Sequence, residues 1–461
     1  MKKILTILST VLLLSSCGLY NKYERPDNVN TTGLVRDTQN DVDTLALNTD
    51  PNFGELPWRE VFTDPQLQSL IETALDNNTD LANAALNVKM MQDMLKVAKL
   101  AFLPGIAIAP SGTISRVQTD GATTSKTYQL PISASWNVDL FGNILSQKRS
   151  AQAKLLMAKD YQVAVQTQIV CGVANLYYTL MMLDEQQAIV TDMEQLTKET
   201  WEIMKLQNQL GMARSTSVQS AEASYYSVKA QAVDLRRQIR EMENSLSLLL
   251  NEAGHQISRG NLYDQHLPEK FSAGVGIQLL SNRADVHAAE MTLAQCFYDV
   301  ETARSRFYPN ITVTGSATFT NNLGAVVNPG KWLLSAIGSL TQPIFQHGQI
   351  VAGLRVAKGQ QEQAFNTWQN TILKAGNEVS NALLLYNSSE EKAQLIAHQV
   401  ELYTQNVVDT RLLYQSKGSS YLEVIQAQSS LLNARISKVQ EDFTKMQAVV
   451  NLYQALGGGG K

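Results

Sequence analysis

One cysteine near the start of the chain stands where a covalent modification is expected. Cys17 follows the basic pair Lys2-Lys3, an apolar run over residues 4–14 and two serines. A basic start followed by a short apolar run is typical of a secretory signal. The run is also shorter than the roughly 20 apolar residues that cross a bilayer as a helix. The pattern predicts export from the cytoplasm.

The residues before Cys17 also resemble a bacterial lipobox, in which the cysteine thiol is diacylated and becomes the first residue of the mature chain. The resemblance implies a signal peptide over residues 1–16. It also implies a diacylglycerol and an N-acyl lipid, covalently bound to Cys17. The alternative is an ordinary signal that is cleaved elsewhere, with Cys17 incidental.

The other residues that could do chemistry predict neither an enzyme nor a metal site. Cys171 and Cys296 lie in apolar helical contexts, which favours buried side chains over a disulfide framework. No two of the five histidines are spaced i, i+4 as metal ligands on a helix would be. No nucleophile elbow, phosphate loop or paired-carboxylate motif is present, so we expect no cofactor other than the lipid.

The charge balance gives no reason to expect nucleic acid as a partner. The net charge of −4 becomes −6 once Lys2 and Lys3 are removed (−4 − 2), whereas nucleic-acid binding calls for a basic surface. No second segment is apolar enough for a transmembrane helix. If the chain crosses a membrane, it must do so with strands, because only helices and closed barrels satisfy their backbone in lipid.

Proline placement divides the chain into two kinds of region. All eleven prolines lie at or before Pro131, or between Pro268 and Pro343. Proline costs about 3 kcal/mol inside a helix, so the proline-free stretches permit very long helices. Apolar residues at heptad spacing support the first of them; they are Ile169, Val173, Leu176, Leu180, Leu183, Val190 and Met193.

A glycine turn interrupts each proline-free stretch once, at Gly211 and at Gly418. Each glycine is followed by Ser or Thr, which is typical of a helix C-cap running into an N-cap. We therefore expect two long helical hairpins, over residues 146–253 and 348–456. The spacing from each glycine to the next matching valine predicts that the second turn is one residue shorter.

The proline-bearing regions alternate small or polar residues with apolar ones. Residues 105–138 and 310–343 each predict two strands joined by a loop. This alternation is typical of a barrel wall with a wet lumen. The alternative is a pair of soluble surface hairpins.

The two halves of the sequence repeat each other at a shift of 205 to 207 residues. Phe102-Leu103-Pro104 corresponds to Phe307-Tyr308-Pro309 (309 − 104 = 205), and Gly211 to Gly418 (418 − 211 = 207). We infer a duplication, with repeats over residues 64–267 and 268–461. An extended arm over residues 17–63 precedes the repeats, and a helix over residues 283–306 opens the second one. The fold class is mainly α with a small β part.

Four strands cannot close a barrel, for which about eight is the minimum. The chain must therefore oligomerise, unless its strands do not enter the membrane. Three copies would supply twelve strands and a closed tube of helices.

Several segments resemble the TolC/OprM outer-membrane factor family, in its NodT-like branch. They are the lipobox and residues 23–26, 58–67, 135–142, 282–290, 421–428 and 452–458. The resemblance implies a homotrimeric exit duct in the bacterial outer membrane, with a helical tunnel in the periplasm. It also implies a periplasmic adaptor and an inner-membrane transporter of the RND type as partners.

The resemblance also implies roles at the periplasmic tip. The turns around Gly211 and Gly418 would contact the adaptor. Glu423 and Gln426 occupy the positions where TolC carries two aspartates that narrow the closed entrance. Glu423 keeps the charge and Gln426 does not. Glu423 could instead be a solvated or capping carboxylate, because it lies near a helix start.

The function predicted is that of the outer-membrane channel of a tripartite efflux system, a passive conduit. The alternatives are a type I secretion duct and a structural coiled-coil periplasmic lipoprotein. The duplicated strands favour a duct, because a coiled-coil spacer has no use for them. The sequence does not separate drug, metal and protein cargo.

Overall fold

A computed structural model provides the structure of the chain, and its parts fall into two compact units. The first unit comprises residues 1–29, 86–160 and 287–370, and the second comprises residues 30–85, 161–286 and 371–461. Each is described separately. The residues that the structure describes are 21–26, 34, 53–117, 123–268, 283–321, 331–416 and 420–460.

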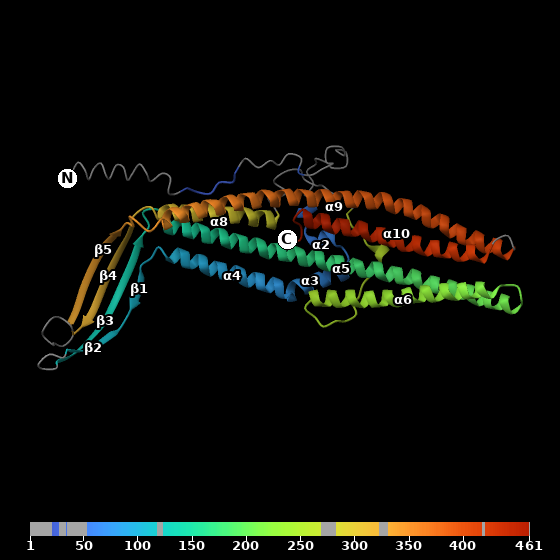
Figure 1. The fold of residues 1–461 in the computed structure, drawn as a ribbon, viewed down its shortest axis with the longest axis horizontal. Helices are drawn as coiled ribbons and strands as arrows, with labels where there is room; N and C mark the ends of the chain where they lie inside the picture. Colours follow the sequence, from blue (N-terminus) through green and yellow to red (C-terminus); the bar gives the residue numbers. More distant parts are fainter. Residues whose placement is uncertain are drawn as a thin grey trace. The chain divides into compact units, whose positions relative to one another are not determined.

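The helices confirm the duplication, because corresponding helices have equal lengths. α4 and α8 have 22 residues each, α5 and α9 have 67 each, and α6 and α10 have 35 each. The second set begins 205 or 206 residues after the first (284 − 79, 349 − 143 and 421 − 215). The bounds are α4 Thr79–Leu100, α5 Asn143–Gln209, α6 Ser215–Leu249, α8 Ala284–Ser305, α9 Gln349–Gln415 and α10 Tyr421–Ala455 (Figure 1).

The two long hairpins are present, within a few residues of the expected bounds. Five residues separate the helices in each case, 210–214 in the first hairpin and 416–420 in the second. The prediction of a shorter second turn is therefore wrong. At the shift of 206 that relates the helices, Gly211 corresponds to Lys417 and not to Gly418, so only the glycine's place in the turn differs. Gly418 lies outside the described residues.

The helix expected at the start of the first repeat is two helices, α3 (Pro65–Asn77) and α4. Asn78 ends one and begins the other, because its side-chain Oδ1 accepts hydrogen bonds from the backbone N–H groups of Asp80 (2.9 Å) and Leu81 (3.2 Å). Asp64 caps α3 in the same way, accepting from Gln66 at 2.8 Å with proline at the first helical position.

The strands form one antiparallel sheet in the order β1-β3-β4-β5, with β2 also paired to β3. The first of the four expected strands is divided into β1 and β2 at Pro110. Proline lacks the N–H that a sheet ladder requires. The strands are β1 Gly105–Ile108, β2 Ser111–Val117, β3 Thr123–Val138, β4 Asn310–Thr320 and β5 Lys331–Thr341.

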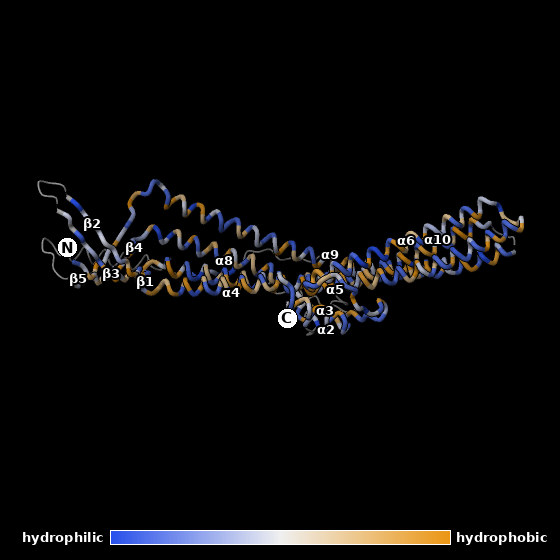
Figure 2. Tube along the Cα trace, turned by 90° about the horizontal axis from the view of Figure 1, so that it is seen from below, coloured by the Kyte–Doolittle hydropathy of each residue, from blue (hydrophilic) through white to orange (hydrophobic). Residues whose placement is uncertain are grey.

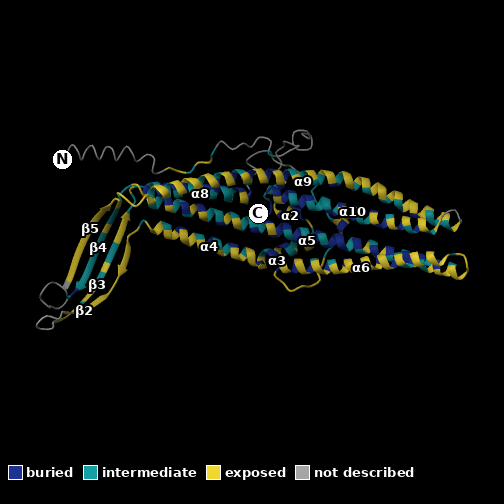
Figure 3. Ribbon diagram, in the orientation of Figure 1, coloured by how far each residue is buried: buried dark blue, intermediate teal, exposed yellow. Residues whose placement is uncertain are grey.

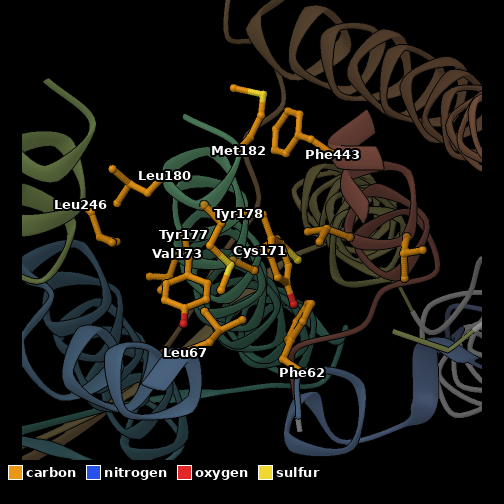
Figure 4. Packing of buried hydrophobic residues seen from close by; sticks show 14 of the residues in the cluster. Phe62, Leu67, Cys171, Val173, Tyr177, Tyr178, Leu180, Met182, Leu246 and Phe443 are labelled. Carbon is orange, nitrogen blue, oxygen red and sulfur yellow. The ribbon is translucent and has the colours of Figure 1, made fainter. Parts of the chain in front are cut away.

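The second unit has the main hydrophobic core, built from α2 (Trp58–Val61), α3 and the sections of α5, α6 and α10 that lie in this unit (Figure 3). Tyr177 and Tyr178 of α5 are fully buried there, and Figure 4 shows their rings among Phe62, Cys171 and neighbouring side chains. These tyrosines therefore pack between helices. Cys171 is buried as expected, whereas Cys296 is only half-buried.

The predicted heptad positions of α5 lie in this core, since all are buried except Leu176, which is partly buried. Hydrophobic and hydrophilic residues accordingly alternate along the hairpin helices (Figure 2). None of the helices within the described ranges carries an apolar stretch that could cross a membrane.

Candidate functional site: a two-faced sheet and the hairpin tip

The sheet of the first unit exposes an apolar face. Cross-strand register aligns Ile108 with Ile132, Ile132 with Ala317, and Ala317 with Leu334, so these residues share one face. The same alternation places eleven large apolar side chains on this face, each at least 37 % exposed. We call it the apolar face; the eleven are Ile106, Ile108, Ile114, Tyr128, Leu130, Ile132, Trp136, Val313, Trp332, Leu334 and Leu340.

The opposite face of the sheet is mostly hydroxyl and amide groups. The Ser316 and Ser335 hydroxyls are 2.7 Å apart, and Thr312 donates to Asn137 Oδ1 at 2.9 Å. We call this the polar face; its polar residues include Ser133, Ser135, Asn137, Thr312, Thr314, Ser316, Ser335 and Ser339. Leu333 and Ile337 are exceptions to the pattern. A sheet with one wet face and one uncovered apolar face can separate water from lipid.

Aromatic rings lie at both ends of the apolar face. Phe319 is 6.4 Å from Tyr128 and 5.6 Å from Trp332, between ring centroids, near the loop ends of the strands. At the other end, Trp136 donates from Nε1 to the Phe102 carbonyl at 2.9 Å. Trp136 and Tyr128 are eight residues apart on β3, about 26 Å along the strand at about 3.3 Å per residue. A tilt of about 40° reduces this to about 20 Å of height, near the about 25 Å band of membrane strands.

The first hairpin tip, in the second unit, ends α5 with a Schellman motif. Met212 N–H donates to the Gln207 carbonyl at 2.8 Å and Gly211 N–H to the Asn208 carbonyl at 3.0 Å. Gly211 has φ of 71°, a left-handed conformation that glycine adopts without strain. The expected C-cap role of Gly211 is confirmed. The expected Ser or Thr N-cap is wrong, because Arg214 holds that position and makes no side-chain capping bond.

The second tip carries the predicted gate residues on one face of α10. Glu423 and Gln426 are both exposed and three residues apart, so they point to the same side. Ser420, the N-cap residue, donates from Oγ to Glu423 Oε1 at 3.2 Å and makes no side-chain bond to the backbone. The Glu423 carboxylate lies in the first turn, where the helix dipole favours it. Cys17, like Gly418, lies outside the described residues.

Near the tip, α5 contacts both helices of the second hairpin. The Tyr414 hydroxyl donates to Gln207 Oε1 at 2.5 Å, and Gln428 Nε2 donates to Thr200 Oγ1 at 3.2 Å. Burial raises the pKa of the Tyr414 and Tyr421 phenols, so both are neutral at physiological pH. Sequence reasoning missed these contacts. The one sequence signal for the Tyr414–Gln207 contact is that both residues lie within two positions of the C-terminal ends of their helices.

The geometry defines a class of protein: a sheet suited to a membrane boundary, joined to paired helical hairpins of equal length. Comparison with known proteins supports the same class. The sequence matches the outer membrane efflux protein family twice, over residues 70–252 and 276–458, at the same shift of 206 that relates the repeats (276 − 70). The chain belongs to this family and is a protein of the bacterial outer membrane.

Individual relatives resemble the chain along its whole length. The cation efflux system protein CusC of Escherichia coli O157:H7 is 26% identical over 97% of each chain. The antibiotic efflux pump outer membrane protein ArpC of Pseudomonas putida is 27% identical over 99% of this chain and 96% of its own. The open-state MtrE outer membrane channel of Neisseria gonorrhoeae superposes with a TM-score of 0.84, at 26% identity, over 96% of this chain and 98% of that one.

Proposed function

We propose that three copies of the chain assemble into a passive exit duct that docks to a periplasmic adaptor and, through it, to an inner-membrane transporter of the RND type. The printed names of the relatives differ in cargo, a cation for CusC and an antibiotic for ArpC. A conduit whose cargo is selected by the attached pump would account for that difference.

The observation that carries the proposal is the two-faced sheet. Its apolar face would lie against lipid and its polar face against the aqueous passage. The outer edges of β5 and of β1 and β2 have no neighbouring strand among the described residues. Unpaired edges of this kind favour pairing with further strands, and a second and third copy would supply them.

Two adjacent residues of β5 provide a matched test of the faces. Leu334→Arg places a charge on the apolar face, at a cost of about 2–4 kcal/mol if that face meets lipid. Ser335→Arg places the same charge on the polar face. We expect the wild-type chain to run as a detergent-soluble trimer and to conduct ions in a planar bilayer. Leu334→Arg should impair insertion, whereas Ser335→Arg should insert and shift ion selectivity toward anions.

Equal insertion of the two variants would contradict the assignment of the faces. A water-soluble wild-type monomer would overturn the duct itself and favour a structural periplasmic lipoprotein, the second candidate. A type I secretion duct would also conduct, so co-purification of the adaptor and pump decides between export of small molecules and of protein.

At the tip, we infer that Glu423 of the three copies narrows the entrance and binds cations. Support comes from its exposure beside Gln426 on one face of α10. Glu423→Gln should weaken blockade of the channel by multivalent cations added from the periplasmic side, while Gln426→Ala should leave it unchanged. Blockade that persists in Glu423→Gln would leave Glu423 with a capping role alone.

The lipid on Cys17 is a further part of the proposal. Cys17→Ser should prevent acylation, as measured by mass spectrometry of the mature chain. Trimers should still assemble, because the sheet would hold the protein in the membrane without the lipid. Loss of assembly in Cys17→Ser would contradict this secondary role of the lipid.

A further inference from the structure

Close to the tip, in the second unit, a cavity of about 590 Å³ lies between α5, α9 and α10. Cavities that hold small organic molecules typically measure about 300–1,000 Å³. The walls come from three helices and one turn residue: Thr200, Ile203, Met204, Gln207, Met212, Arg411, Tyr414, Gln415, Tyr421 and Val424. Helices α5 and α9 belong to different repeats, so a molecule bound here would contact both hairpins.

Six of the ten lining residues are apolar or aromatic. Tyr414 and Tyr421 meet edge to face, with ring centroids 5.8 Å apart and an interplanar angle of 65°. Met204 and Met212 add flexible thioethers, which adapt to ligands of different shape and make favourable contacts with aromatic rings. Such walls suit a flat, apolar molecular body.

Three polar side chains of the wall, Thr200, Gln207 and Tyr414, already have hydrogen-bond partners. The Tyr414 hydroxyl donates a hydrogen bond to the Gln207 side chain. The Thr200 hydroxyl donates to the Leu196 carbonyl and accepts from the Gln428 side chain. Arg411 is the charged residue of the lining. Within the described ranges, no carboxylate oxygen lies within the 4.0 Å ion-pair distance of its guanidinium. A guanidinium recognises a carboxylate through two parallel hydrogen bonds.

We propose that this cavity binds an aromatic organic anion, with the apolar body between the methionine and tyrosine side chains and the carboxylate on Arg411. Glu423, of the predicted acidic ring, does not line the cavity, although its neighbours Tyr421 and Val424 do. Because the bound anion would contact α5 and the α9–α10 hairpin together, it would hold the two hairpins at their present separation. The ligand would therefore act as an effector of the tip rather than as cargo.

The first repeat provides a matched control for Arg411. The equivalent residue is Lys205 (411 − 206), whose ammonium lies 6.0 Å from the ring centroid of Trp201 and does not line the cavity. Removing either charge alters the net charge of the tip equally. Only Arg411 would contact the bound anion.

The test uses the full-length trimer in lipid nanodiscs and three probes of similar shape: 1-naphthoate, 1-naphthalenemethanol and 1-naphthylmethylammonium. Ligand-detected NMR titrations measure the Kd of each. We expect saturable binding of 1-naphthoate, at least about tenfold tighter than either analogue. Its Kd should rise at least about tenfold in Arg411→Gln, less in Arg411→Lys, and not at all in Lys205→Gln.

Equal affinity for naphthoate and its alcohol, or an unchanged Kd in Arg411→Gln, would overturn the proposal. Met212→Trp provides a second arm if Arg411→Gln fails to assemble. It keeps the guanidinium and fills the cavity from an exposed turn position, so it should abolish naphthoate binding. Naphthoate binding that survives in Met212→Trp places the ligand elsewhere, such as on the lipid-facing sheet.

Discussion

The two repeats have helices of equal length but place different side chains at equivalent positions. α5 and α9 both have 67 residues, yet the exposed Glu423 of the second tip corresponds to Ser217 of the first (423 − 206). A residue added to one hairpin alone would displace its turn by about 1.5 Å relative to the other, so lengths are constrained together. Each side chain is constrained only by its own surroundings, so the two repeats have diverged in the side chains at equivalent positions.

The largest expected difference between the repeats concerns Tyr453 and its counterpart Ser247 (453 − 206), both fully buried. Tyr453 lies against the rings of Phe53 and Phe62, 5.5 and 5.8 Å between centroids, and donates to the Leu56 carbonyl at 2.7 Å. Tyr453→Ala should lower the free energy of unfolding by about 3–5 kcal/mol. Ser247→Ala should lower it by about 1 kcal/mol. Urea titration in detergent measures both, and equal losses would contradict the comparison.

A second comparison concerns ion pairs at Asp184 of α5 and its counterpart Glu390 of α9 (390 − 206). Arg259, nearly buried, donates to both oxygens of Asp184 at 2.5 and 2.8 Å and to Glu243 at 2.7 Å. Lys445 meets Glu390 at 2.7 Å in a half-exposed setting.

The Arg259–Glu243 pair is nearly buried on both sides, and removing one partner of a buried pair costs about 3–5 kcal/mol. A half-exposed pair such as Lys445–Glu390 contributes about 0–1 kcal/mol. Arg259→Met should therefore destabilise the chain far more than Lys445→Met, measured as the shift in the midpoint of thermal unfolding. A Lys445→Met shift as large as that of Arg259→Met would show that the exposed pair is equally important.

A smaller effect is expected where the two longest helices begin. Asp139 Oδ2 accepts from the Leu145 N–H at 2.8 Å, whereas the equivalent position before α9 is Phe345 (139 + 206), an exposed ring. Asp139→Ala should cost about 0.5–2 kcal/mol, as the loss of a capping group does. Hydrogen exchange should then accelerate in the first turn of α5. Phe345→Ala should leave exchange in the first turn of α9 unchanged, and acceleration there would contradict the difference.

The smallest expected effect depends on pH and concerns His287 of α8. A hydrogen bond to Asp160 of α5 at 2.7 Å raises the pKa of the imidazole, with burial opposing, Glu290 adding to the rise and Arg25 opposing it. Arg25 also donates to both Glu290 oxygens, at 2.9 and 2.6 Å.

A raised folded-state pKa contributes stability below the ordinary value near 6.5, and this stability is lost as pH rises through the folded pKa. The stability difference between wild type and His287→Gln should be up to about 1 kcal/mol at pH 6 and smaller at pH 9. Thermal unfolding at both values measures it, with His398→Gln, an exposed histidine, as the control. A difference that grows toward pH 9 would contradict the raised pKa.

Much of the architecture could be predicted from sequence because it depends on local rules. The absence of proline and the heptad spacing of Ile169 to Met193 predicted α5, and the shift of about 206 predicted its partner α9. Predictions that depended on single side chains were less reliable. The Ser or Thr cap expected after Gly211 is Arg214, since Asn208 Nδ2 instead closes the turn by donating to the Ala213 carbonyl at 2.7 Å. The roles of Cys17, Glu423, Gln426 and Gly418 stay predictions.

The sequence by itself determined the duplication, the length of the helices and the alternation of the strands, because periodicity and the positions of proline and glycine are properties of neighbouring residues. Only the tertiary structure decided which side chains meet across those elements. The register that unites eleven apolar side chains on one face, the bond between Tyr414 and Gln207, and the cavity around Arg411 all join segments far apart in the chain. Contacts of this kind depend on how strands and helices pack, which no local pattern specifies.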